Sequence, residues 1–230
     1  MGVTLLSIGT NQKTIKSDRQ GDYLTAIMYL SPAREHGLKA NLCPKSSEGC
    51  VKACLYTSGR GNMNVVQEAR RSRARLYIKY PDLFKEMLRD ELSKFQDRCK
   101  GGVKPAVRLN GTSDIVWEKK FPEIFKDFPD IQFYDYTKIW NRRPEENNYH
   151  LTYSYSEDIT DNLVRRRLKK GSNVAIVFSD KLPDTHLGYL VEDGTKDDLR
   201  FRDTPGTVVG LKALGRAKKD TSGFVIRGYG

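Results

Sequence analysis

Three cysteines lie close together in this chain and indicate a metal site. Cys43, Cys50 and Cys54 fall within the string NLCPKSSEGCVKACLY, with the spacing C-x6-C-x3-C. The Gly, Pro, Ser and Lys residues around them are not typical of a hydrophobic core. Thiolates are preferred ligands of zinc and of iron–sulfur clusters. The sequence therefore predicts that these three cysteines bind a metal.

The type of metal stays open at this point. A structural zinc ion takes four protein ligands, and the candidates for the fourth are Cys99, His36, His150 and His186. A [4Fe–4S] cluster bound by three cysteines keeps one iron free for a cofactor or a substrate, which would make the site catalytic. We expect Cys99, which is isolated in the sequence, to be a buried small apolar residue.

A second group of polar residues follows the predicted strands. In parallel α/β proteins the chemistry takes place at the carboxyl ends of the strands, so polar residues at those ends are site candidates. The candidate cofactor-binding residues are Asn110, Gly111, Thr112 and Ser154. The candidate catalytic residues are Asp114, Asp135, Lys138 and Glu157. In this arrangement one rim of the sheet collects carboxylates, hydroxyls and a lysine.

The elements that must position these residues alternate between strands and helices. Apolar and aromatic runs bounded by turn residues predict six core strands, at 23–30, 103–110, 131–137, 149–155, 173–178 and 207–211. Helical spacing predicts helices at 65–80, from Pro81 to about Gly101, and at 160–170. Strands separated by helices favour an α/β fold, either a six-stranded partial (β/α) barrel or a largely parallel sheet.

The length of 230 residues favours a single domain over 1–230. Within it we distinguish an N-terminal arm (1–22), a Cys-rich loop (31–64) after the first core strand, and a hairpin insertion (187–203) around Asp193-Gly194. Loops as long as the Cys-rich loop are usually functional.

The charge of the chain points to a polyanionic partner. It contains 40 basic and 29 acidic side chains, a net charge of +11, and such an excess favours nucleic acid or nucleotides. We expect Arg70, Arg71, Arg73 and Arg75 on the predicted helix 65–80 to contact phosphates. No apolar run approaches the roughly 20 residues of a membrane span, and the N-terminus does not read as a signal peptide. We therefore expect a cytoplasmic protein with no membrane partner.

The position of the cysteines resembles that in the radical S-adenosylmethionine enzymes. Those enzymes carry three cysteines in the loop after the first strand of a six-stranded partial barrel. Here the spacing is 6 and 3 where that group has 3 and 2, and the glutamate of its glycine motif is missing. The resemblance implies a [4Fe–4S] cluster on Cys43, Cys50 and Cys54, and S-adenosylmethionine as the cofactor. It also implies that Asn110 and its neighbours line the cofactor.

A more extensive resemblance covers almost the whole chain. The strings ACLYTSGRG, KPAVRLNGTSDI, FYDYTK and NYHLTYS, with the C-terminal LRF and GFV segments, are similar to a bacteriophage family called gene product 88. This resemblance implies a phage-encoded protein that works in the host bacterial cytoplasm. It supplies no activity.

Three functions follow. The first is an iron–sulfur enzyme, similar to the radical S-adenosylmethionine enzymes, that acts on nucleic acid or nucleotides, for example in DNA modification. The second is a zinc-stabilised basic protein that binds nucleic acid or a host protein without catalysis. The third is a base-exchange enzyme that resembles the guanine transglycosylases, with Asp114 and Asp135 as nucleophile and general acid/base. The sequence does not determine the oligomeric state.

Overall fold

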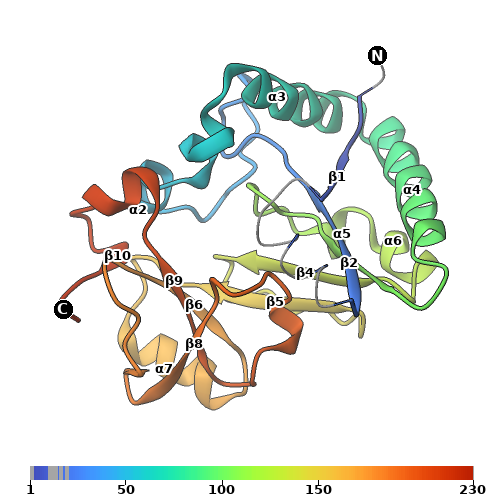
Figure 1. Cartoon of the computed structure of the whole chain (residues 1–230). Helices are drawn as coiled ribbons and strands as arrows, with labels where there is room; N and C mark the ends of the chain where they lie inside the picture. Colours follow the sequence, from blue (N-terminus) through green and yellow to red (C-terminus); the bar gives the residue numbers. More distant parts are fainter. Residues whose placement is uncertain (1–2, 10–14, 16–17, 19–20, 230) are drawn as a thin grey trace.

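The computed structural model describes residues 3–9, 15, 18 and 21–229. Within them the chain forms a ten-stranded sheet in the order β1-β2-β3-β4-β5-β6-β9-β8-β7, and β10 pairs with β6 (Figure 1). The strands are β1 (Leu6–Ile8), β2 (Tyr23–Met28), β3 (Lys104–Arg108), β4 (Gln132–Thr137), β5 (Tyr149–Ser154), β6 (Val174–Phe178), β7 (Thr185–His186), β8 (Tyr189–Asp193), β9 (Val208–Lys212) and β10 (Val225–Ile226).

The six predicted core strands are confirmed as β2, β3, β4, β5, β6 and β9, and neighbours in this series are parallel. Strands β2 to β6 lie side by side in their sequence order, so each connection moves one strand further in the same direction. β8 continues the parallel series next to β9. The largely parallel sheet is therefore confirmed. Within the described residues no pairing joins the end strands β1 and β7, so closure into a barrel is not observed.

The helices are α2 (Glu48–Lys52), α3 (Asn64–Lys79), α4 (Pro81–Arg98), α5 (Trp117–Lys120), α6 (Pro122–Asp127) and α7 (Asp161–Lys169). Pro81 begins α4 because a proline at the first helical position loses no hydrogen bond. The apolar stripe of α4 includes Phe84 and Phe95, and it is buried with Phe133 of β4 in the main core. No helix in the described part of the chain is long and apolar enough to cross a membrane.

The two faces of the sheet differ because side chains alternate along a strand. On β4, Phe133 joins the main core under the helices, whereas Tyr134 points to the other face and packs with Ala106 and Leu199. We call this other face the inner face. It is covered by the short 3-10 helix η3 (Arg200–Arg202).

The predicted hairpin exists but is shorter and turns elsewhere. β7 and β8 are antiparallel, and the turn lies at Leu187-Gly188, where both residues have positive φ angles of 55° and 82°. Positive φ at both central residues is typical of a type I′ hairpin turn. Asp193-Gly194 instead ends β8, because the Gly194 N–H donates to the Gly210 carbonyl and Asp193 accepts from Thr195. The segment 194–203 then leads into η3.

Both ends of the chain contribute strands that the sequence did not predict. In the expected N-terminal arm, β1 pairs antiparallel with β2. The Glu91 carboxylate of α4 accepts hydrogen bonds from the N–H groups of Leu5 and Leu6, at 2.7 and 2.8 Å. Most of the remaining arm, 10–14, 16–17 and 19–20, lies outside the described residues. Near the C-terminus β10 pairs with the end of β6, beyond the point where β5 leaves it.

Candidate functional site

The Cys-rich loop lies against the carboxyl ends of the strands. It contains α2 and two short 3-10 helices, η1 (Leu55–Thr57) and η2 (Gly59–Asn62). The backbone N–H of Asp114, in the loop after β3, donates to the Leu42 carbonyl at 2.8 Å. The sulfur of Cys43 lies 3.8 Å from the Thr112 carbonyl. The structure thus brings the predicted cysteines next to the polar residues that follow β3.

Glu157, which follows β5, fixes the middle of this loop. One carboxylate oxygen accepts the Ser47 hydroxyl at 2.7 Å, and the other accepts the Gly49 N–H at 2.6 Å. Ser47 in turn caps α2 by accepting the N–H of Cys50 at 3.2 Å. A Cβ on Gly49 would lie 2.7 Å from the same carboxylate, so only glycine permits this approach. Glu157 therefore positions Cys50, and its carboxylate is occupied.

The three clustered thiols lie within electrostatic range of one another, and each has an N–H group nearby. Cys43 accepts the backbone N–H of Ala33 at 3.4 Å. The backbone N–H of Tyr56 lies near Cys54 and the Lys138 ammonium lies near Cys50, and each opposes the effect of burial on the pKa of that thiol. Hydrogen bonds to sulfur are a recurrent feature of metal-bound thiolates, where they tune the site.

Burial raises the pKa of all three thiols, that of Cys43 to about 12. Without a metal these residues are therefore protonated thiols at neutral pH, and a bound cation would have to displace the protons. In the described part of the chain, no three His, Cys, Asp or Glu side chains are already arranged to hold a metal ion. The donor set suits a soft metal, but the sulfurs must turn toward it.

Asp114 and Lys138 lie beside the thiols. The Asp114 carboxylate accepts the Thr137 hydroxyl and the Lys138 backbone N–H, each at 2.8 Å, and it lies 3.5 Å from the Arg142 guanidinium. Burial raises its pKa in spite of these partners. The Lys138 ammonium donates to the Tyr155 carbonyl at 3.3 Å and lies 5.2 Å from the centre of the Phe224 ring.

Asn110 and Asp135 form an enclosed network on the helix-covered side of the sheet. Asp135 is fully buried and accepts the Asn110 N–H at 2.7 Å, the Asn110 amide at 3.1 Å and the Tyr149 hydroxyl at 2.7 Å. Burial raises the pKa of Asp135 to about 6. The Asn110 side-chain oxygen accepts from Ser113, Ile115 and Trp117. These two residues hold the loop after β3 together, and their polar atoms face the chain itself.

The other candidate cofactor-binding residues also contact the chain. Gly111 lies so close to β2 that a Cβ would be 2.7 Å from the Met28 carbonyl. The Thr112 hydroxyl donates to the Leu30 carbonyl at 2.6 Å. Ser154 is half-buried at the end of β5, opposite Ala175 of β6. Gly111 and Thr112 therefore lock the end of β3 onto the end of β2, next to the Cys-rich loop.

The α3 arginines are used mainly within the protein. Arg70 is buried, and its guanidinium lies over the Tyr29 and Tyr56 rings, near Cys54. The other three guanidiniums donate to backbone carbonyls: Arg71 to Glu35, Arg73 to Thr4 and Tyr29, and Arg75 to His36. These bonds fasten the Cys-rich loop and the N-terminal segment to α3. The structure does not present the four side chains as a free phosphate-binding row.

The four candidates for a fourth metal ligand have other surroundings. His36 bonds through one ring nitrogen to the Ala33 carbonyl and through the other to the Leu38 N–H, so it shapes the Cys-rich loop. His186 bonds to the Tyr229 hydroxyl at 2.7 Å. His150 points to the inner face of the sheet, where its pKa falls to about 4. Cys99 is buried in the main core at the end of α4, in agreement with the expectation from the sequence.

The inner face carries a polar cluster that the sequence analysis missed. Arg108 donates to Asp198, which also accepts the Tyr134 hydroxyl. Arg200 forms ion pairs with Asp197 and Asp203. Several buried polar atoms here have no hydrogen-bond partner in the described structure: Arg108 Nε, His150 Nε2, Thr152 Oγ1 and Arg200 Nε. The sequence contains one indication of this cluster, because polar residues occupy alternate positions of the strand Tyr149–Ser154.

The fold and the site together define a parallel α/β protein with a thiol-rich loop over the carboxyl ends of its strands. The chain belongs to the family described as Gene product 88, whose model matches residues 4–228. This family is the phage family to which the sequence strings pointed. No curated protein matches the chain. No solved structure matches it either, so the resemblance to radical S-adenosylmethionine enzymes has no support from the comparisons.

Proposed function

We propose that this protein is an iron–sulfur enzyme in which Cys43, Cys50 and Cys54 bind three irons of a [4Fe–4S] cluster. The observation that carries the proposal is the arrangement of the thiols. Three cysteines from one loop are grouped at the carboxyl ends of a parallel sheet, and each sulfur has an N–H group nearby. A structural zinc ion has less support, because His36, His186 and Cys99 are engaged elsewhere and zinc takes four protein ligands.

The chain would contribute binding and charge around such a cluster. Such a cluster would supply electrons through its open iron, and S-adenosylmethionine, the cofactor that suits this chemistry, would bind beside Asp114 and Lys138. Arg70 and Lys138 place two positive charges near Cys54 and Cys50, and these charges favour the deprotonated thiols that a metal requires. Glu157 holds α2, and therefore Cys50, in place.

The substrate in this proposal is nucleic acid or a nucleotide, in accordance with the net charge of +11. The base-exchange alternative receives less support. A base-exchange enzyme would need the Asp135 carboxylate to be accessible to the substrate. Asp135 is instead fully buried and accepts three hydrogen bonds from its neighbours. A binding protein without catalysis remains the main alternative, and metal analysis separates the two.

The test is the metal content of protein purified without oxygen. We expect about four irons per chain and absorbance at about 400 nm, as for a thiolate-bound cluster. Cys50→Ser should lose most of the iron, because a three-cysteine site has no spare ligand. Cys99→Ala is the matched control: it also removes one thiol, but from the hydrophobic core.

Two results would contradict the proposal. One is equal iron content in Cys50→Ser and Cys99→Ala. The other is parent protein that contains zinc and no iron. In either case the chain would be a binding protein rather than an iron–sulfur enzyme.

A further inference from the structure

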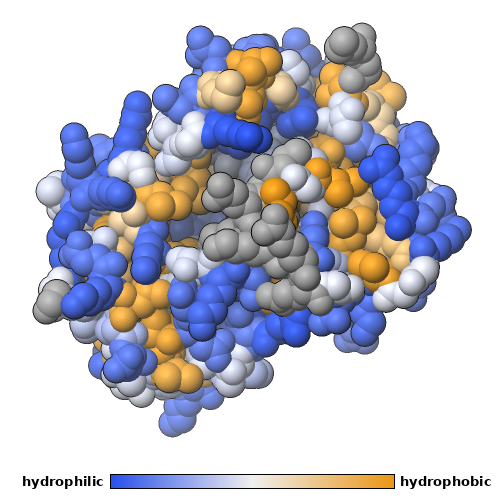
Figure 2. Space-filling model, viewed as in Figure 1, coloured by the Kyte–Doolittle hydropathy of each residue, from blue (hydrophilic) through white to orange (hydrophobic). Residues whose placement is uncertain are grey.

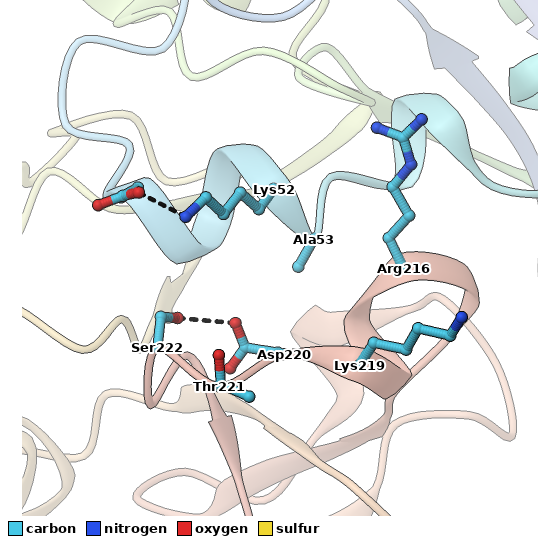
Figure 3. A pocket seen from close by; sticks show the side chains of 8 residues that line it. Lys52, Ala53, Arg216, Lys219, Asp220, Thr221 and Ser222 are labelled. Atoms are coloured by element: carbon cyan, nitrogen blue, oxygen red, sulfur yellow. Dashed lines mark hydrogen bonds and ion pairs between the residues drawn. The ribbon is translucent and has the colours of Figure 1, made fainter.

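A solvent-exposed cleft adjoins the outer side of the Cys-rich loop. It lies between α2 and the 3-10 helix η4 (Gly215–Lys219), and its volume is about 430 Å³ (Figure 3). The lining residues are Glu48, Lys52, Ala53, Arg216, Lys219, Asp220, Thr221 and Ser222. The cleft is therefore formed by the helix that carries Cys50 and by a basic segment far from it in sequence.

The cations of η4 are available to a partner. Arg216, Lys218 and Lys219 are all exposed, and within the described structure no hydrogen bond or ion pair of their side chains is found. The nearby acids are already engaged. Glu48 pairs with Lys52 at 2.5 Å, and the Asp220 carboxylate accepts the Ser222 hydroxyl at 2.7 Å and the Val225 N–H at 3.0 Å.

This basic segment is packed firmly against the Cys-rich loop. Ala217, the buried residue of η4, shares a small apolar core with Ala53, next to Cys54. A Cβ on Gly215 would lie 2.4 Å from the Ser58 hydroxyl, so η4 and the end of the loop are in direct contact. Because both walls of the cleft are anchored in this way, a ligand on η4 is held at a fixed position relative to the cysteines.

The surroundings of the cleft are hydrophilic with a few apolar side chains. Figure 2 shows hydrophilic side chains protruding on the side of the molecule where Figure 1 places α2, beside hydrophobic atoms. Val51, Leu55 and Leu214 are exposed large apolar residues of these segments. Among the residues that the structure describes, none that lines the cleft is aromatic, so contact with phosphates is favoured over base stacking.

We propose that η4 and the α2 cleft bind the sugar–phosphate backbone of a nucleic acid. Arg216, Lys218 and Lys219 supply the phosphate contacts, in place of the α3 arginines that bond within the chain. This inference rests on the proposed function for one point only, namely that the bound strand is the substrate of the cysteine site. The binding itself is independent of base sequence, because phosphates carry no sequence information.

The experiment is fluorescence anisotropy with labelled DNA oligonucleotides of one sequence, single-stranded and double-stranded, at several salt concentrations. The test variant is Arg216→Glu/Lys218→Glu/Lys219→Glu. The control variant is Lys119→Glu/Lys120→Glu/Lys126→Glu, which changes the net charge equally on exposed residues of the α5–α6 region. Circular dichroism and thermal unfolding check that both variants are folded.

We expect the η4 variant to bind about tenfold more weakly or worse, with a reduced salt dependence, since up to three phosphate contacts are lost. The DNA affinity of the control variant should stay within about threefold of that of the parent, because its substitutions change only the long-range electrostatic field of the protein. The better-bound oligonucleotide identifies single or double strands as the ligand. Equal weakening in both variants, or no binding by the parent, would overturn the inference.

The metal content of the η4 variant separates this inference from the proposed function. We expect it to equal that of the parent, because η4 supplies no thiol. Parent protein that binds DNA through η4 but contains no iron would support the surface and refute the enzyme. Parent protein that contains iron but has no DNA affinity would support the enzyme and refute the DNA-binding surface.

Discussion

The network of Asn110 and Asp135 on the helix-covered face and the polar cluster on the inner face both contain buried polar side chains, but these two groups differ in how completely they are bonded. On the helix-covered face, Asp135 accepts three hydrogen bonds and Asn110 bonds through both of its amide atoms. On the inner face, the Thr152 hydroxyl, the His150 Nε2 atom and the Arg200 Nε atom have no partner within the described structure.

This difference separates polar residues that build the site from polar residues that are open to a ligand or to water. Buried polar groups are normally hydrogen-bonded, because an unpaired one costs about 1–3 kcal/mol. The network of Asn110, Asp114 and Asp135 therefore shapes the loops that present the cysteines. The inner-face cluster keeps donors that have no partner within the described structure.

The largest effect is expected from the helix-covered face. Asp135→Ala leaves the Asn110 N–H, the Asn110 amide and the Tyr149 hydroxyl without their acceptor. Breaking a buried charged network of this kind should lower the free energy of unfolding by about 3–5 kcal/mol. Urea denaturation of the parent and of Asp135→Ala measures this loss of unfolding free energy.

Asp158→Ala is the matched control for that substitution, because Asp158 is an exposed aspartate just after Glu157. It should change the stability by less than about 0.5 kcal/mol. Similar losses in both variants would show that the Asp135 network contributes nothing specific, and the contrast between the two faces would fail.

A change of pH is expected to have an intermediate effect on the free energy of unfolding. Burial and the charge of Arg200 lower the pKa of His150 from 6.5 to about 4. The folded state therefore binds this proton more weakly than the unfolded state, and the stability from neutral His150 is lost as the pH falls from about 6.5 to about 4. The difference in unfolding free energy between the parent and His150→Gln should shrink over that range, by up to about 3 kcal/mol.

The pH dependence of stability from Asp135 has the opposite sign, because the pKa of Asp135 in the folded state, about 6, lies above the ordinary value. The folded state binds this proton more tightly, so the contribution of Asp135 to stability decreases as the pH rises from about 4 to about 6. Difference profiles against His150→Gln and against Asp135→Asn should therefore slope in opposite directions. Profiles with the same slope would mean that one of the two groups is not buried as the structure has it.

Much of the fold could be predicted from the sequence. The six core strands and the helices α3, α4 and α7 follow apolar periodicity and turn residues, which are local signals. β1 and β10 are short strands that depend on long-range pairing, so their local sequence is weak. The hairpin turn was misplaced because Asp-Gly is a common turn signal, whereas Leu187 adopts a positive φ that its residue type does not favour.

The candidate site was predictable in position and less so in detail. The sequence placed the cysteines near the ends of the strands, and the structure does bring Cys43 beside Thr112 and Cys50 beside Lys138. It could not show that Glu157 and Asn110 bond within the chain, because such contacts depend on residues distant in sequence. For the same reason the α3 arginines seemed free from the sequence alone, although three of them donate to backbone carbonyls.

The smallest effect gives the sharpest comparison, because two threonines of neighbouring strands point to opposite faces. The Thr152 hydroxyl on the inner face is buried without a partner, whereas the Thr137 hydroxyl donates to Asp114 and accepts the Ile139 N–H. Valine has nearly the shape of threonine. Thr152→Val should therefore raise the free energy of unfolding by about 1 kcal/mol, and Thr137→Val should lower it by about 1–2 kcal/mol. Urea denaturation of both variants measures the two signs. If Thr152→Val also destabilised the protein, its hydroxyl would have a bound partner in solution, and the contrast between Thr152 and Thr137 would fail.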